Sequence, residues 1–136
     1  MADPSLALHG AINVRLRADI AAVGGRVLDH VPSDVSFPYI EIGEFQTLDD
    51  GAQCHDGQEV FVTLHVWSRP GDDRPGQVEA KTIAGAVRGS LHEAALDLGA
   101  DWQFLEIAHQ DTRYLKDPDG LTSHAVLTFR ALTAAV

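Results

Sequence analysis

The stretch EVFVTLHVWS, residues 59–68, decides how this chain folds. Aliphatic side chains alternate in it with aromatic or polar ones, and this period of two predicts a β-strand with two different faces. One face carries Val60, Val62, Leu64 and Val66, and the other carries Phe61, Thr63, His65 and Trp67. The two faces therefore need different surroundings.

A turn and a helix follow this strand. Arg69–Gly76 contains two prolines and two glycines, which favour turns and interrupt hydrogen bonding between strands. After Gly76 the apolar spacing changes to that of a helix. We expect this helix to cover the aliphatic face of the strand with Val78, Ile83, Val87, Leu91 and Leu98.

The flanking sequence predicts a second helix and four more strands. The helix spans Pro4–Val23, and the strands span Arg26–Val31, Pro38–Thr47, Trp102–Leu115 and Thr122–Thr133. The order is then α-β-β-β-α-β-β, and the short turn Lys116–Gly120 makes the last two strands antiparallel. We expect one α+β domain over residues 1–136, with two layers: two helices on a mostly antiparallel sheet of four to five strands.

The strand Pro38–Thr47 and the loop after it depart from regular alternation. Gly43 falls inside the strand and predicts a β-bulge. The following loop, Leu48–Gly57, is polar and long for a hairpin connection. Loops of this length in a compact domain are often functional or mobile, so this one is a candidate functional segment.

Composition bounds the class of protein. The chain has 136 residues, of which 45% are hydrophobic, enough to fill the core of one domain. Its one cysteine, Cys54, excludes an intrachain disulfide. The N-terminus lacks the pattern of a signal peptide, and no stretch approaches the roughly 18 apolar residues of a membrane span. We therefore expect synthesis in the cytoplasm and no membrane partner.

The acidic residues are unevenly distributed. The net charge is −10, which argues against nucleic-acid binding through phosphate contacts. No Lys or Arg lies between Arg26 and Arg69, an interval with eight acids: Asp29, Asp34, Glu41, Glu44, Asp49, Asp50, Asp56 and Glu59. This interval is either a solvated surface that maintains solubility or a surface that repels polyanions or meets a basic partner.

The sequence contains no recognisable catalytic, cofactor or metal motif. None of the seven histidines has the spacing of a metal-binding helix, although His65 and His109 lie on strands that can approach each other. Cys54, His55 and Asp56 are adjacent, but a nucleophile needs a base brought from elsewhere in the fold. We predict no catalytic residue, no metal ligand and no cofactor.

Five motifs, in order along nearly the whole chain, resemble the tail-terminator (tail-completion) family of long-tailed phages and gene transfer agents. The motifs are FPYIEIG at 37–43, VTLHVWS at 62–68, KTIAGAVRGSL at 81–91, RYLKDPDG at 113–120 and AVLTFRA at 125–131. The resemblance implies a structural particle protein, not an enzyme. It implies a hexameric ring at the tail–head junction that ends the tail tube, joins the head-completion (stopper) proteins and lets DNA pass without specific binding.

The resemblance suggests roles for the aromatic residues on the uncovered strand face and for four of the acids. Large aromatics on an uncovered strand face suit a subunit interface, so we expect Phe61 and Trp67 to lie between subunits. We expect Asp49, Asp50, Asp56 and Glu59 to face the lumen or the tube protein. Two other functions stay open: another head–tail connector component, or a small-ligand-binding or enzymatic domain that uses Phe61, His65 and Trp67.

Overall fold

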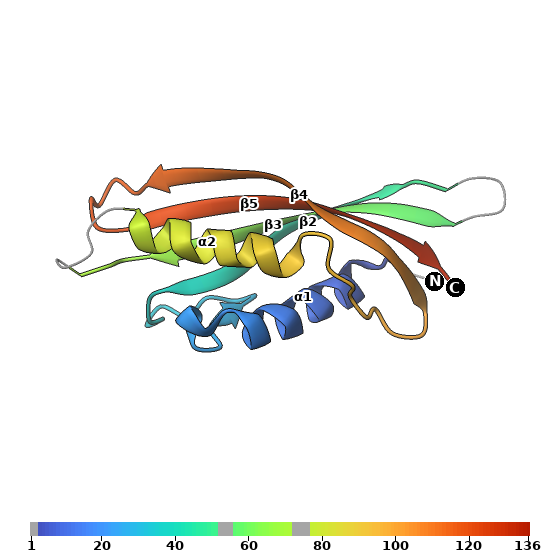
Figure 1. Ribbon diagram of the computed structural model, residues 1–136, viewed down its shortest axis with the longest axis horizontal. Helices are drawn as coiled ribbons and strands as arrows, with labels where there is room; N and C mark the ends of the chain where they lie inside the picture. The colour runs from blue at the N-terminus through green and yellow to red at the C-terminus, as the bar shows by residue number, and fades with distance from the viewer. Residues whose placement is uncertain (1–2, 52–55, 72–76) are drawn as a thin grey trace.

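The fold consists of one sheet with two helices on one side of it (Figure 1). The computed structural model describes residues 3–51, 56–71 and 77–136. The elements are α1 (Ser5–Asp19), a 3₁₀ turn (Ala21–Val23), β1 (Val27–Leu28), β2 (Tyr39–Asp49), β3 (Gly57–Ser68), α2 (Val78–Leu91), β4 (Trp102–Lys116) and β5 (Ser123–Ala135). This is the predicted α+β order with two helices and five strands.

The sheet has the strand order β1-β2-β3-β5-β4, so β3 lies at its centre. The pairs β2–β3, β3–β5 and β4–β5 are antiparallel, whereas β1 runs parallel to β2, and the sheet is therefore mixed. The register between β2 and β3 shifts between Ile42 and Phe45, which confirms the predicted bulge at Gly43.

The core lies between the helices and one face of the sheet. The aliphatic residues of β3, Val60, Val62, Leu64 and Val66, are fully buried there. From α1 they meet the stripe Leu8, Ile12 and Leu16, and from α2 the stripe Ile83, Val87 and Leu91. Both stripes repeat every four residues, which places their side chains on one side of each helix.

The first helix and the first strand are shorter than predicted. The α-helix ends at Asp19 because Ile20 leaves helical geometry, and Ala21–Val23 form a separate 3₁₀ turn. Gly24, at φ 56°, ends that turn in a conformation that favours glycine. The strand predicted over Arg26–Val31 reduces to Val27–Leu28, because only these two residues pair with β2.

The second helix ends at Leu91 and does not extend to Leu98. Glu93 adopts φ 60°, and its N–H donates to the carbonyl oxygen of Ile107, so the chain turns onto β4. Leu98 is still buried, but from the segment after the helix. Val78 is 59% exposed, because five residues of helix rotate it by about 140° from Ile83.

The hairpin between β2 and β3 is also tighter than predicted. Leu48 pairs with Glu59 and Asp49 with Gln58, so the connection is residues 50–56 instead of Leu48–Gly57. Residues 52–55 of this connection, Cys54 and His55 among them, lie outside the described residues. None of the described helices is long and apolar enough to cross a membrane.

Candidate assembly interface

Neither of the described α-helices lies over the second face of the sheet (Figure 1). We call this surface the open face; on β3 it consists of Phe61, Thr63, His65 and Trp67. All four side chains are half-buried, while their neighbours on the other face are fully buried. The structure thus places Phe61 and Trp67 on the uncovered side, as the alternation predicts.

Trp67 is held in a stack of rings on the open face. The centroid of its ring lies 3.7 Å from the ring centroid of His124 on β5, with 11° between the two planes. It lies 6.4 Å from the ring centroid of Tyr39 on β2. Its indole N–H donates to Glu41 Oε1 at 3.0 Å. Because the stack and the hydrogen bond fix the ring, Trp67 presents a rigid apolar surface.

Two histidines share a hydrogen bond beside this ring. His65 Nδ1 and His124 Nε2 are 2.8 Å apart, so one nitrogen donates and the other accepts. Burial lowers the pKa of His124, and the neighbouring His65 lowers it further. His65 Nε2 lies 3.3 Å from the exposed carboxylate of Glu44. The neutral form of His124 is therefore the one that the folded open face favours.

His65 and His109, which the sequence allowed to approach each other, do not meet in the structure. His65 meets His124, whereas His109 bonds Thr112 through its ring and donates its backbone N–H to His92 Nδ1. His109 is the cross-strand partner of Phe129, whose side chain is buried on the covered side of β5. His109 therefore lies on the covered side of the sheet, and His65 lies on the open face. The strand order, with β5 next to β3, decides which histidines meet, and the sequence carried no signal for that order.

A shallow hollow lies next to Phe61 on the open face. Its volume is about 330 Å³ and it is lined by Glu44, Phe45, Gln46, Phe61, Thr63 and Thr128. The bulge at Gly43 brings β2 close to β3 here: a Cβ atom on Gly43 would lie 2.7 Å from His65 Nε2. The close approach of the two strands at the bulge therefore requires a glycine at this position.

The four acids expected at a lumen or tube contact divide into two kinds. Asp49, Asp50 and Asp56 are exposed at the hairpin end of β2 and β3, where the N–H of Asp50 donates to the carbonyl of Gly57. Glu59 instead forms an ion pair with Arg130 of β5. Among the described residues, no ion pair involves Asp49, Asp50 or Asp56, whereas the charge of Glu59 is compensated by Arg130.

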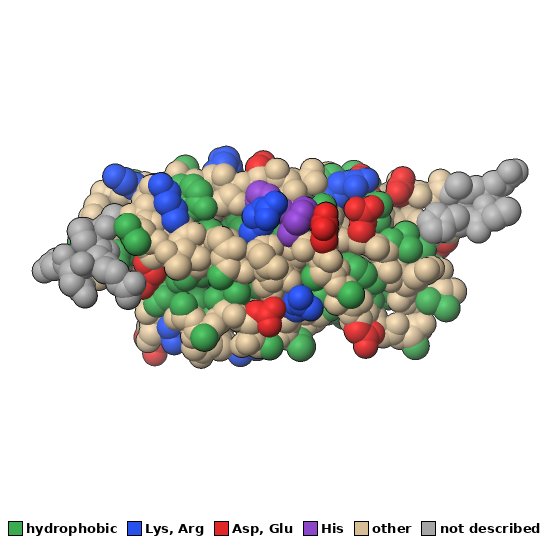
Figure 2. All heavy atoms as spheres, viewed as in Figure 1, with side chains coloured by type: hydrophobic (Ala, Val, Ile, Leu, Met, Phe, Trp, Pro, Cys, Tyr) green, Lys and Arg blue, Asp and Glu red, His purple; other side chains and the backbone are tan. Residues whose placement is uncertain are grey.

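The eight acids of the cation-free interval do not form one patch. Asp29 and Asp34 precede β2, while Asp49, Asp50 and Asp56 follow it. An eleven-residue strand separates the two groups by roughly 35 Å. On the side of the molecule seen in Figure 2, acidic and basic side chains are interspersed among apolar ones. The hairpin end is therefore one acidic site, and the region before β2 is another.

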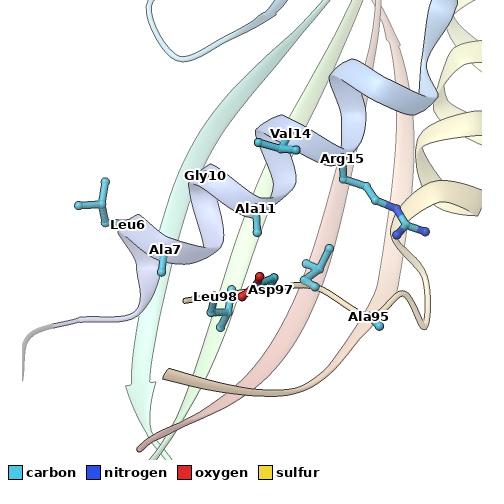
Figure 3. A pocket seen from close by; sticks show the side chains of 10 residues that line it. Leu6, Ala7, Gly10, Ala11, Val14, Arg15, Ala95, Asp97 and Leu98 are labelled. Carbon is cyan, nitrogen blue, oxygen red and sulfur yellow. The ribbon is translucent and has the colours of Figure 1, made fainter. Parts of the chain in front are cut away.

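On the helix side, an apolar groove runs between α1 and the segment 95–98 (Figure 3). Its volume is about 560 Å³, and it is lined by Leu6, Ala7, Gly10, Ala11, Val14, Arg15, Ala95, Leu96, Asp97 and Leu98. Arg15 binds Asp19 and the carbonyl oxygen of Ser90, and Asp97 accepts the N–H of Gly99. The groove thus presents mainly apolar surface.

The described residues contain no group of three or more His, Cys, Asp or Glu that could hold a metal ion. The adjacent Cys54 and His55 lie outside those residues, so the structure does not describe their surroundings. What the described residues do offer is two uncovered surfaces suited to contacts with other proteins: the open face and the groove along α1.

Comparison with known proteins identifies the family. The family model of tail completion protein gp17 matches residues 10–134, nearly the whole chain. The chain belongs to this family. The resemblance seen in the sequence is thereby confirmed, and this tail completion protein is a structural component of a tailed virion or a related particle.

One solved structure with the same fold is the virion of a native gene transfer agent particle. Its matching chain superposes with a TM-score of 0.81 over 93% of this chain and 94% of that chain, at 24% sequence identity. At this identity the likeness shows a shared fold. No curated protein matches the tail completion protein significantly.

Proposed function

We propose that this tail completion protein forms a ring, a hexamer by its resemblance to tail terminators, that caps the tail tube. The ring stops addition of tube subunits, joins the tube to the head-completion proteins and lets DNA pass. The observation that carries this proposal is the open face, where rigid aromatic surface lies over the centre of the sheet without a helix to cover it.

In this proposal Phe61 and Trp67 belong to the contact between subunits. Aromatic residues are enriched in protein interfaces because they bury large area at little entropic cost. Trp67 is already fixed by His124 and Glu41, so it loses little freedom on binding. Phe61 borders the hollow of about 330 Å³, which offers a concave surface to a neighbouring subunit.

Asp49, Asp50 and Asp56 have a different role in the proposal, at the lumen or at the tube. They lie together at the hairpin end, and within the described part of the chain no Lys or Arg forms an ion pair with them. Negative charge there lets a polyanion slide past instead of binding. Glu59 contributes less to this effect, because Arg130 compensates its charge.

The ring acts by shape and by contacts, without a catalytic step. In the groove, which is the larger hollow, the polar side chains of Arg15 and Asp97 are occupied by neighbouring groups. A catalytic pocket requires polar groups that converge on a substrate. The groove and the open face both fit protein partners better than a small substrate.

The interface proposal is tested with the double variant Phe61→Ala, Trp67→Ala. We expect it to stay folded but to lose self-association in light scattering and binding to purified tail tubes. The control is Leu121→Ala, which removes a 65% exposed side chain from the turn between β4 and β5. An assembly state equal to wild type in the double variant would contradict the proposed interface.

The charge proposal is tested separately, by reversing Asp49, Asp50 and Asp56 to Lys. We expect this triple variant to impair particle assembly or DNA delivery, because the reversed charges attract DNA phosphates. The control Glu59→Gln removes a carboxylate already paired with Arg130 and should leave DNA delivery nearly unchanged. Normal assembly and normal DNA delivery in the triple variant would exclude both the lumen and the tube contact.

A further inference from the structure

Several polar side chains line the hollow beside Phe61 on the open face. Glu44 contributes a carboxylate, Gln46 an amide, and Thr63 and Thr128 contribute hydroxyls. In the part of the chain that the structure describes, no hydrogen bond engages the side chains of Gln46, Thr63 or Thr128. These donors and acceptors are therefore available to a group that enters the hollow from outside the subunit.

Glu44 gives this hollow its charge. Its side chain is 78% exposed, and its carboxylate lies 3.3 Å from His65 Nε2. Neither β2 nor β3 contains Lys or Arg. Arg130 is the cross-strand neighbour of Phe61 on β5, but it does not line the hollow, and its Nε donates to Glu59. Among the described residues, no Lys or Arg therefore compensates the negative charge at the hollow.

A guanidinium group matches this lining better than other ligand groups do. It carries a positive charge, donates up to five N–H bonds in one plane, accepts none and stacks on aromatic rings. The carboxylate of Glu44 and the hydroxyl oxygens of the two threonines can accept these bonds. The ring of Phe61 offers a surface for stacking. An anion would be repelled by Glu44, so the hollow of about 330 Å³ is suited to an arginine side chain.

Two arginines, Arg88 and Arg113, can supply such a group. Of the arginines that the structure describes, these two alone have side chains without a hydrogen bond or an ion pair. Arg113 and His65 are both cross-strand partners of Val126, so Arg113 lies on the open face together with the hollow. Arg88 is exposed on α2, which lies on the other side of the sheet (Figure 1). Arg88 is therefore the one that a head-to-tail contact can bring to the open face of another copy.

The surface of α2 around Arg88 allows another chain to approach closely. Gly85 lies one turn before Arg88 and Gly89 directly after it, and a Cβ atom on either glycine would meet nothing within 4 Å. Packing within the described subunit therefore does not require these glycines, although glycine is unfavourable in the middle of a helix. The one acid of α2, Glu79, accepts a hydrogen bond from Ser68. The charge of Arg88 is thus available to a partner.

The positions of Arg88 and the hollow agree with a head-to-tail contact. They lie on opposite sides of the sheet, and in a ring of identical subunits one surface of each subunit meets a different surface of the next. We propose that Arg88 of one subunit enters the hollow of a second copy of this chain, stacks on Phe61 and pairs with Glu44. This inference rests on the proposed ring and identifies the second surface of its contact, which the aromatic residues do not.

The test reverses one charge at a time. Glu44→Arg changes the hollow and Arg88→Glu changes the helix; both side chains are exposed, so both variants should fold. We expect each variant alone to associate at least about tenfold more weakly than the wild type in analytical ultracentrifugation, because each places two like charges at the contact. Asp34→Arg and Lys116→Glu make the same charge changes at exposed positions outside both surfaces and should associate like the wild type.

Mixing the two charge-reversed variants gives the decisive result. The Glu44→Arg copy keeps Arg88 and the Arg88→Glu copy keeps Glu44, so the original pair forms between them. The expected product contains the two variants in equal numbers. Association of either variant alone at wild-type strength, or a mixture that associates no better than its components, would overturn the inference. The neutral variants Glu44→Gln and Arg88→Gln repeat the test in case circular dichroism shows that a charge reversal prevents folding.

The same variants separate this inference from the proposed ring. A wild type that is monomeric both in solution and on tube ends overturns the ring itself. Where rings form only on tube ends, the variants are scored there. Each reversal alone should fail to cap tubes, and the mixture should cap them, because every contact in an alternating ring then joins opposite charges. Tubes capped by Arg88→Glu alone would leave the ring standing and overturn Arg88 as the group that enters the hollow.

Discussion

The two faces of β3 come from the same ten residues but meet different surroundings. On the covered face, Val60, Val62, Leu64 and Val66 are fully buried by the helices. On the open face, Phe61 and Trp67 are half-buried, and the Trp67 ring is held by His124 and Glu41 of the neighbouring strands. The covered face holds the subunit together, and in our proposal the open face holds subunits to each other.

Because of this difference, we expect substitutions on the two faces to change different measured quantities. A side chain of the covered face contributes to the free energy of unfolding of the isolated subunit. A side chain of the open face contributes mainly to association.

The largest effect is expected for Leu64→Ala, which removes a fully buried side chain from the centre of the core. Such a substitution lowers the free energy of unfolding by about 2–5 kcal/mol, because it loses apolar burial and leaves a cavity. Thr63→Ala, the neighbouring position on the open face, should change it by no more than about 0.5 kcal/mol. Chemical denaturation measures both, and equal losses would contradict the separation.

An intermediate effect is expected for Gly43→Ala, at the bulge between the faces. The new Cβ atom would lie 2.7 Å from His65 Nε2 and 3.0 Å from the carbonyl oxygen of Thr63, so the strands must shift. We expect a loss of about 1–3 kcal/mol in the free energy of unfolding. As a control, Gly85→Ala in α2 meets nothing within 4 Å and should stabilise the protein by roughly 0.5–1 kcal/mol. A neutral Gly43→Ala would mean that the bulge is not tightly packed.

The smallest effect concerns pH and the histidine pair of the open face. Burial and His65 lower the pKa of His124 in the folded protein, so as pH falls the unfolded chain takes up the proton first. Stability is therefore present above the ordinary imidazole pKa of about 6.5 and is lost as pH falls below it. Glu41 and Asp117 oppose this effect and Arg113 adds to it.

The measurement is the melting temperature of wild type and His124→Asn at about pH 7.5 and about pH 5.5. These conditions bracket the ordinary imidazole pKa and stay above the range in which Asp3 and Asp119, with lowered pKa values, titrate. The wild type should lose more stability on acidification than the variant. The variant keeps part of the slope, because burial also lowers the pKa of His109. Equal slopes would show that His124 does not titrate differently in the folded protein.

The sequence was sufficient for what depends on local periodicity. The alternation of residues 59–68 separated the two faces of β3 correctly, and Leu8, Ile12 and Leu16 marked the buried side of α1. The groove was readable in the same way: Leu6, Gly10 and Val14 also repeat every four residues, about 200° around the helix from the buried stripe. That second stripe is the sequence signal for the groove.

What depends on strand order and register was not predictable from the sequence. His65 meets His124, and Glu59 meets Arg130 across 71 residues, only because β5 lies beside β3. The helix α2 ends earlier than its apolar pattern predicts, for a related reason. Ala94, Ala95 and Leu98 continue an apolar pattern, but the hydrogen bond from Glu93 to Ile107 on β4 turns the chain away.

Electron microscopy of the protein mixed with purified tail tubes tests the central claim most directly. The account predicts a closed ring at one end of the tube, with an open channel and with the face of β3 that carries Phe61 and Trp67 in contact with the next subunit. Tubes that keep growing in the presence of the protein, or copies that bind singly along the tube wall, would contradict it.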